Sequence, residues 1–342
     1  YCNDTFPHLN PLEGLPMLRV DFIPVLEDQH YMLRSLGDHA ATGGFRIDAI
    51  AHLSTTVVNP NNHTVSNVCN DLALRCYKDG MTYKYVQSGH QVPDDLILYG
   101  EDVGINYYRS KHFYDKGFLT TDFKLLDTLK KAFGFGGDLV WLARNNADNN
   151  HGERMGTKYP IKQAITCVRT HDHYANQHLN GRGIGHTNAL SDPEDIMLAT
   201  CFLMARKNGI PLILAPDLKP DCYQLFTILS LFRKRVFNVP SCEFYNNEYQ
   251  GLIDECCLFL QRGNAGFIII NKRGDVPNKP GKKSVTLLPD MVFYCFDAKG
   301  TCYSPLGEKQ AGPRRYMSND CKTAEVPARG VIIAINEKLI NF

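Results

Sequence analysis

The feature that most constrains the fold of this chain is an alternation of short apolar runs with helical segments between residues 22 and 216. Residues 22–36 carry apolar side chains at helical spacing. The next run, "GGFRIDAIAHL" (43–53), is short, apolar and led by glycines, which is typical of a strand. "LILY" (96–99) is apolar on both faces, as a buried parallel strand would be. This order predicts a parallel sheet or a (β/α) barrel.

The same alternation continues as far as Pro216. "GFLTTDF" (117–123) and "QAITCVRTHD" (163–172) are further strand candidates. A helix is predicted to begin at the N-cap Asp192, with Pro193 in its first turn and Gly209 as its stop. The strand candidates then end with "IPLILAP" (210–216).

The pattern of predicted helices and strands changes after Pro216. One helix is predicted at about residues 221–236, and strands separated by turns follow it. We therefore expect a partial (β/α) barrel domain at 1–217 and an antiparallel all-β domain of sandwich type at 218–342.

Composition excludes two classes of partner. The chain has 342 residues, and its 37 basic and 36 acidic residues leave a formal net charge of +1. This balance favours neither nucleic acid nor an anionic membrane as a partner. No apolar run approaches the roughly 20 residues of a membrane span. We therefore expect no membrane partner.

The cysteines and two glycosylation sequons favour an extracellular protein. Twelve cysteines suit an oxidising compartment. Asn3 and Asn62 each begin an N-x-T sequon, the acceptor pattern of secreted proteins. Cys295 and Cys302 bracket "FDAKGT", a predicted hairpin turn, and form the best local candidate for a disulfide. The sequence thus predicts a secreted, glycosylated, disulfide-bonded protein.

Three strand candidates end in acids, namely Asp48, Glu101 and Asp172. In α/β barrels the functional groups lie at the carboxyl ends of the strands. Carboxylates from three strands would then meet in one pocket. Two carboxyls about 5–5.5 Å apart are what a retaining glycosidase needs, one as nucleophile and one as acid/base.

Each of these acids also has a plainer interpretation. Asp48 could be a structural partner of Arg46, which shares its face of the strand. Glu101 could be a solvated strand end. His171 and His173, on either side of Asp172, could bind a metal, but no second cluster with ligand spacing accompanies them. Taken singly, each plain interpretation is favoured over the functional one.

The three acids, taken together with the sequence around them, indicate a function more specifically than any one of them does. "GFRIDAIAH", "YGEDVG" and "VRTHD" resemble, in order, the strand-four, strand-five and strand-seven motifs of the α-amylase family, glycoside hydrolase family 13. "LTTDFKL" resembles the family's sixth strand. "NQHLNGRGIGH" (176–186) and "LQRGNAGFIIIN" (260–271) are similar to segments of animal-type α-amylases.

The resemblance implies a role for each site residue. Asp48 would be the nucleophile, Glu101 the acid/base, and Asp172 would bind the distorted sugar. Three further residues are implied to bind substrate: Arg46, His52 and His171. Arg46 would also keep Asp48 ionised, since a nearby cation lowers the pKa of a carboxyl group. This answers why a charged pair lies within an apolar run.

The chain departs from the family pattern in its first part. The fourth to eighth barrel strands have counterparts, and the first three do not. An incomplete barrel leaves unpaired sheet edges, which are prone to association. We therefore expect a second polypeptide to supply the missing strands, with Cys2 as a candidate for a disulfide to it.

The ion sites of the family are altered as well. The calcium-ligand aspartate falls near "EGLPML" (13–18), where Pro16 or Met17 stands. Calcium prefers oxygen ligands, so its site looks eroded, although it is not lost altogether. Thr170 stands at the asparagine position of the chloride site, and we expect no chloride activation.

Two functions follow from these observations. The first is a retaining glycoside hydrolase that cleaves α-1,4-glucans such as starch or glycogen. The second is a catalytically impaired homologue that serves as a carbohydrate-binding or structural protein in an assembly. The three acids favour the first, and the altered ion sites and missing strands favour the second.

Overall fold

The structure is a computed structural model, and it forms two compact units. Unit 1 comprises Tyr1–Phe123 and Lys158–Ile165, and unit 2 comprises Lys124–Thr157 and Thr166–Phe342. The boundary predicted at residue 217 therefore lies inside unit 2. Within these units the structure describes residues 23–39, 44–48, 50, 68–93, 96–101, 113–142, 164–178, 190–206, 209–237, 249–274 and 281–340.

A sheet with the strand order β1-β2-β3-β4-β5 contains the parallel strands that the sequence predicts. The pairs β1–β2, β2–β3 and β3–β4 are all parallel. Strand β4 is divided between the units after Ile165, and Thr166 donates a side-chain hydrogen bond to the carbonyl of Ile210 in β5. The strands are β1 (Gly44–Ile47), β2 (Ile97–Gly100), β3 (Leu119–Thr121), β4 (Ala164–Cys167) and β5 (Ile210–Leu212).

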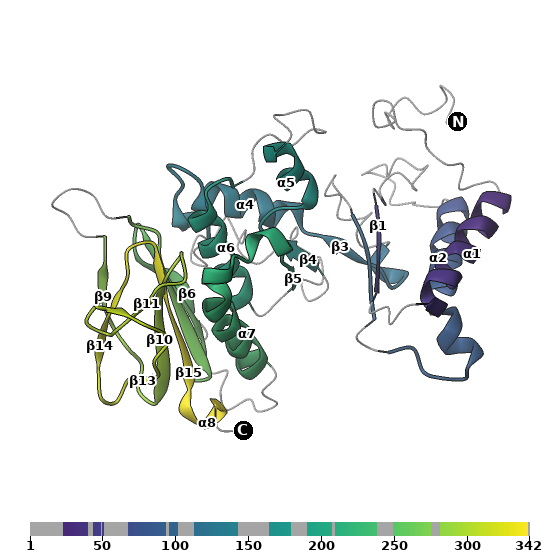
Figure 1. The fold of residues 1–342 in the computed structure, drawn as a ribbon. Coiled ribbons are helices and arrows are strands. Elements are labelled where there is room, and N and C mark those ends of the chain that lie inside the picture. The colour runs from purple at the N-terminus through teal and green to yellow at the C-terminus, as the bar shows by residue number, and fades with distance from the viewer. Residues whose placement is uncertain are drawn as a thin grey trace. The chain divides into compact units, whose positions relative to one another are not determined.

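Two long helices of unit 1 lie side by side, α1 (Ile23–His39) and α2 (Val68–Gln87) (Figure 1). The sequence analysis did not predict α2. Gly80 explains how closely the helices approach, because an added Cβ there would lie 3.0 Å from the carbonyl oxygen of His30. Buried side chains of both helices pack in one hydrophobic cluster: Leu26, Leu33, Ala73, Leu74, Tyr77 and Met81.

Helix α6 of unit 2 begins where local sequence rules place it. The side chain of Asp192 accepts a hydrogen bond from the backbone N–H of Glu194, and Pro193 is the first residue of α6, as predicted. Helix α6 ends at Ala205, before the predicted stop at Gly209. The helices are α4 (Phe123–Phe133), α5 (His171–His178), α6 (Pro193–Ala205), α7 (Tyr223–Phe237) and α8 (Glu337–Ile340).

The strands in the last part of unit 2 are antiparallel, which confirms the change of strand arrangement that was predicted after Pro216. Its large sheet has the order β12-β11-β10-β15-β8-β7-β6, with β13 also paired to β10, and β9 and β14 form a separate pair. The strands are β6 (Tyr249–Asp254), β7 (Cys257–Arg262), β8 (Gly266–Asn271), β9 (Lys283–Thr286), β10 (Met291–Asp297), β11 (Cys302–Tyr303), β12 (Lys309–Gln310), β13 (Tyr316–Met317), β14 (Thr323–Val326) and β15 (Gly330–Asn336).

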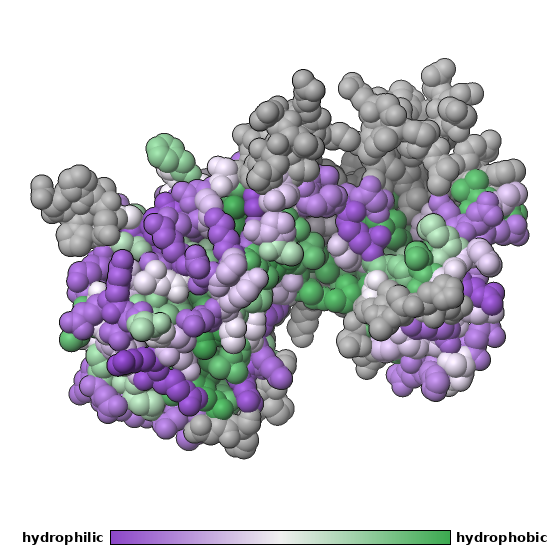
Figure 2. Space-filling model, in the orientation of Figure 1, coloured by the Kyte–Doolittle hydropathy of each residue, from purple (hydrophilic) through white to green (hydrophobic). Residues whose placement is uncertain are grey.

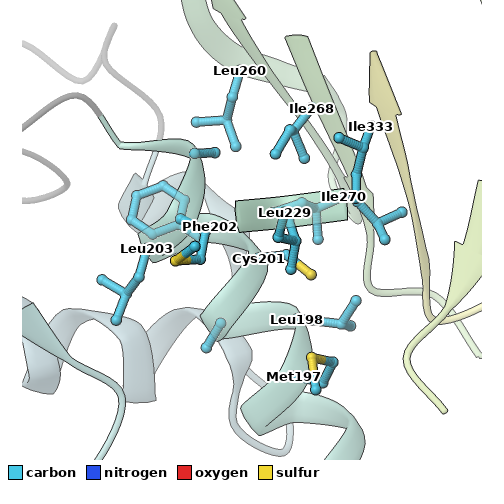
Figure 3. Packing of buried hydrophobic residues seen from close by; sticks show 14 of the residues in the cluster. Met197, Leu198, Cys201, Phe202, Leu203, Leu229, Leu260, Ile268, Ile270 and Ile333 are labelled. Carbon is cyan, nitrogen blue, oxygen red and sulfur yellow. The ribbon is translucent and has the colours of Figure 1, made fainter. Parts of the chain in front are cut away.

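Both faces of the large sheet are covered. Helices α6 and α7 lie on one side, and β9 and β14 lie on the other (Figure 1). Because side chains alternate along a strand, Ile268 and Ile270 enter the core under the helices, while Phe267 and Ile269 enter the core under β9 and β14. Figure 3 shows side chains of the helix-side core gathered in one cluster, among them Leu198, Cys201, Phe202, Leu229, Leu260, Ile268 and Ile333.

Arginines from outside the helix fix both ends of the buried helix α6. Arg329, just before β15, lies 2.8 Å from Asp195 and 2.9 Å from Glu194 in the first turn of the helix. At the other end Arg233 of α7 donates to the carbonyls of Arg206 and Gly209, at 2.6 Å each. A cation at the carboxyl end of a helix and acids at its amino end both complement its dipole.

The predicted disulfide between Cys295 and Cys302 is not formed, and both cysteines are free. The predicted hairpin does exist, as β10 and β11. Its register places Cys302 opposite Phe296 and Tyr303 opposite Cys295. A shift of one residue directs a side chain to the other face of a sheet. The two cysteines therefore belong to different hydrophobic cores.

The cysteines whose side chains the structure describes are free, so they give no support to the expectation of a disulfide-bonded protein. None of the described helices combines the length and the apolarity that crossing a membrane would require. Hydrophilic residues cover much of the visible surface of the β part of unit 2, with apolar residues scattered between them (Figure 2).

Candidate functional site

Two of the predicted catalytic acids lie together at the carboxyl ends of β1 and β2. Ile47 and Gly100 are partners in the parallel register, so Asp48 and Glu101 follow the two strands at the same edge of the sheet. The backbone N–H of Glu101 donates to the carbonyl of Ile47 at 2.9 Å, which extends this pairing by one residue. The two acids therefore lie at neighbouring strand ends, and their catalytic roles stay a prediction.

Arg46 joins the two carboxyl groups. Its Nη1 lies 2.6 Å from Asp48 Oδ1, and its Nη2 lies 2.9 Å from Glu101 Oε2. One planar guanidinium thus forms an ion pair with both acids. The sequence reasoning gave Arg46 the single partner Asp48, and the structure adds Glu101.

The two acids lie in different environments. The side chain of Asp48 is 71% exposed and that of Glu101 is 8% exposed. Burial by itself lowers the pKa of Arg46, but the carboxylates of Glu101 and Asp48 outweigh burial, and the pKa of Arg46 is raised. Arg46 is therefore a fixed positive charge between a buried acid and an accessible one.

Gly100 helps to position Glu101. An added Cβ at Gly100 would lie 2.3 Å from Cδ1 of the buried Ile50, so only a residue without a side chain fits there. The backbone N–H of Ile50 in turn donates to the carbonyl of Glu101 at 2.9 Å. The chain therefore folds back over the end of β2 and fixes the backbone of Glu101 from both sides.

A third acid of unit 1 follows β3, and the sequence analysis did not single it out. Asp122 is fully buried, and its backbone N–H donates to the carbonyl of Ile165 in β4 at 2.8 Å. The signal was available, because Asp122 follows "FLTT" as Glu101 follows "LILYG".

Asp172 and His171 belong to unit 2. Strand β4 ends at Cys167, so Asp172 lies in the first turn of α5 and not at the strand end itself. His171 Nε2 lies 3.4 Å from Asp172 Oδ1, and both side chains are about half exposed. His173 is buried instead and bonds to the hydroxyl of Thr170 through Nδ1 at 2.7 Å. The meeting of Asp172 with Asp48 and Glu101 stays a prediction.

A buried ion pair near α5 was also missed from the sequence. Arg169 Nε donates to both carboxylate oxygens of Asp217, at 3.0 and 3.1 Å, and Arg169 Nη2 also contacts Oδ1. Asp217 directly follows "IPLILAP" (210–216), the run in which β5 lies, and it ends the short 3-10 helix Ala215–Asp217 after that strand.

Several predicted residues lie outside the described part of the chain. These are His52 and the two sequon residues Asn3 and Asn62. Pro16 and Met17, at the expected calcium position, also lie outside it, and neither has a side-chain oxygen. Among the described residues, no group of three or more His, Cys, Asp or Glu side chains could hold a metal ion. A calcium site therefore stays an expectation from the sequence, and we assign calcium no step.

Two solved structures resemble this chain in fold. The alpha-amylase I of Eisenia fetida, solved as a variant with maltohexaose, matches with a TM-score of 0.58 at 19% identity, over 95% of this chain and 67% of that one. An alpha-amylase from Malbranchea cinnamomea matches with a TM-score of 0.52 at 13% identity, over 94% of this chain and 62% of that one. No protein-family model and no curated protein matches the sequence. The fold is therefore α-amylase-like, and the chain spans about two thirds of the length of these amylases.

Proposed function

We propose that this chain is a retaining glycoside hydrolase of animal α-amylase type that cleaves α-1,4-glucans. The observation that carries the proposal is the attachment of Asp48 and Glu101 to the single guanidinium of Arg46, at the ends of neighbouring parallel strands. A retaining glycosidase needs two carboxyl groups held close together. The α-amylase-like fold favours a glucan as the substrate.

In the proposed mechanism the exposed Asp48 is the nucleophile. Arg46 holds its Oδ1, which leaves Oδ2 to attack the anomeric carbon. The buried Glu101 gives a proton to the leaving glycosidic oxygen and then takes one from the water that hydrolyses the glycosyl-enzyme. Asp172 binds the distorted sugar and stabilises positive charge, and His171 bonds a sugar hydroxyl. His52 would also contact substrate.

Release of reducing sugar from soluble starch tests this proposal. Asp48→Asn and Glu101→Gln should each lower the rate by about a hundredfold or more, because each removes a proton-transfer or nucleophilic group. Glu255→Gln is the matched control, since Glu255 is 82% exposed and distant in sequence from the site. The first product should keep the α-anomeric configuration in a proton NMR time course.

Two results would contradict the proposal. Equal release by the native chain and Asp48→Asn would show that Asp48 is not the nucleophile. Glucan binding without any cleavage by a folded native chain would favour the alternative, a carbohydrate-binding or structural homologue. Thermal melting of every variant establishes that each is folded.

The completion of the barrel is part of the same proposal. Strand β1 lies at one end of the described strand order, and none of the described strands pairs with its other edge. The expectation that a second polypeptide supplies the first barrel strands stays a prediction, and so does secretion. Gels of native material with and without reductant test both the second polypeptide and a link through Cys2.

A further inference from the structure

A cavity of about 570 Å³ lies in unit 2 beside the predicted site residues of α5. It is lined by the end of β4, the first turns of α5 and α6, the segment after β5 and the turn after β10. Cavities of roughly 300–1,000 Å³ are typical of small-molecule sites. The catalytic proposal does not use this cavity.

The floor of the cavity is apolar and one wall is aromatic. Ile196 and Met197 of α6 and Ala298 after β10 are all buried and line it. On the wall, Cζ of Arg169 lies 5.0 Å from the ring centroid of Tyr174. A ring fixed in this way offers a flat face for the apolar side of a ligand.

The charged groups of the cavity balance one another. Arg169 is paired with Asp217, and both side chains are 7% exposed. At the rim, Lys299 lies 3.4 Å from Glu194. Lys219 and Asp221 add one further charge of each sign. Three cations and three acids therefore line the cavity, so it has no net charge to attract an anion or a cation.

We propose that this cavity binds a neutral sugar unit of an α-glucan, as a second site apart from Asp48 and Glu101. A sugar combines an apolar ring face with hydroxyl groups that both donate and accept hydrogen bonds. The apolar floor and Tyr174 match the first property, and the mixed charges match the second. The choice of a glucan rests on the proposed function, whereas the preference for a neutral polyhydroxyl ligand rests on the cavity.

Calorimetric titration with maltotriose tests the proposal, in an Asp48→Asn background that prevents cleavage. Adding Tyr174→Ala should weaken one binding event by about fivefold or more. Tyr174→Phe keeps the ring and should bind like the parent. Tyr31→Ala, which truncates a 71% exposed tyrosine of unit 1, is the matched control and should also bind like the parent.

Hydrogen-exchange mass spectrometry locates the bound sugar. Maltotriose should protect peptides that contain residues 190–198 and 214–222. Protection confined to residues 44–50 and 97–101, or equal binding by the folded Tyr174→Ala variant, would overturn the proposal. Binding of inorganic phosphate at the same peptides would also overturn it, because the cavity would then select an anion.

The two proposals can fail separately. Starch is given to the chain with native Asp48 in a parallel assay. If no sugar is released but maltotriose still binds in a Tyr174-dependent manner, the catalytic proposal fails and the second site stands. If starch is cleaved but no Tyr174-dependent binding occurs, the second site is rejected and the catalytic proposal stands.

Discussion

Arg46 and Glu101 form a cross-strand ion pair, with Nη2 of Arg46 2.9 Å from Oε2 of Glu101. The same guanidinium holds Asp48 at its other terminal nitrogen, so its planar fork sets the spacing of the two acids. A lysine would keep the charge but lose the fork. Arg46→Lys should therefore lower the rate of starch cleavage by about tenfold or more, with little change in melting temperature.

The control for this substitution is Arg273→Lys. Arg273 forms an ion pair with the exposed Glu255 at 3.4 Å, so the same exchange is made outside the site. Its activity should equal that of the native chain. Unchanged activity of Arg46→Lys would show that the fork does not position the acids.

Lys272 stabilises the end of α4 from the β part of unit 2. Its Nζ donates to the carbonyls of Ala132, Gly134 and Gly137 at 2.8–2.9 Å. Replacing it by methionine keeps the apolar stem but removes the Nζ donor from all three carbonyls, of which Gly134 keeps the backbone N–H of Gly137. Lys272→Met should lower the free energy of unfolding in urea by about 2–4 kcal/mol. Lys309→Met, at an exposed position in β12, is the control and should change it by less than about 0.5 kcal/mol.

Asp254 should make stability depend on pH. Burial raises its pKa, but hydrogen bonds from Lys283 and from the backbone of Cys256 outweigh burial, so the pKa of Asp254 is lowered on folding. A lowered carboxyl pKa contributes stability above the unfolded pKa of about 3.9, and this is lost as pH falls through the folded pKa.

Asp254→Asn should therefore lower the melting temperature at pH 7, and the difference from the native chain should shrink toward pH 2–3. The loss in free energy of unfolding should stay below about 1 kcal/mol, because the Asp254–Lys283 ion pair is partly exposed to solvent. Asp320→Asn, at an exposed turn, serves as the control. A difference that grows as the pH falls would contradict the assignment.

Cys256 and Cys257 are neighbours with different reactivity. Cys257 is fully buried, and burial raises the pKa of its thiol to about 12, whereas Cys256 is only half-buried. Since the thiolate is the reactive form, iodoacetamide at pH 8 should label Cys256 well before Cys257. Peptide mass spectrometry distinguishes the two sites through the variants Cys256→Ser and Cys257→Ser.

The same labelling examines Cys295 and Cys302. After unfolding in urea without reductant, peptides that contain these residues should carry a label at both thiols. Detection of a cross-linked peptide would show that the predicted disulfide between Cys295 and Cys302 forms. Its formation would require the β10–β11 register to differ from the one described here.

Local chemistry was enough to predict some features from the sequence. Asp192 and Pro193 mark the beginning of α6 because a cap and a first-turn proline act within a few residues. Asp48 and Glu101 were predicted together because parallel strands bring their carboxyl ends to one edge. The first inference rests on neighbouring residues alone, whereas the second rests on the expected parallel pairing of the strands.

Other features depend on contacts that a sequence does not display. Gly80 lies in the middle of α2, where it reads as a helix breaker, yet it is needed for the approach of α1. The hairpin that holds Cys295 and Cys302 was predicted, but its register, which separates them, was not. The pairing of Arg169 with Asp217 likewise joins residues far apart in the chain.

The helix-side core of unit 2 draws residues from both sides of residue 217, with Phe202 and Leu198 before it and Ile268 and Ile333 after it. Genetic recombination at residue 217 would separate the residues on one side of this core from those on the other. Helices α6 and α7 and the large sheet are therefore expected to be inherited and transferred together, and a gene product that ends near residue 217 should aggregate, because it would lack half of this core.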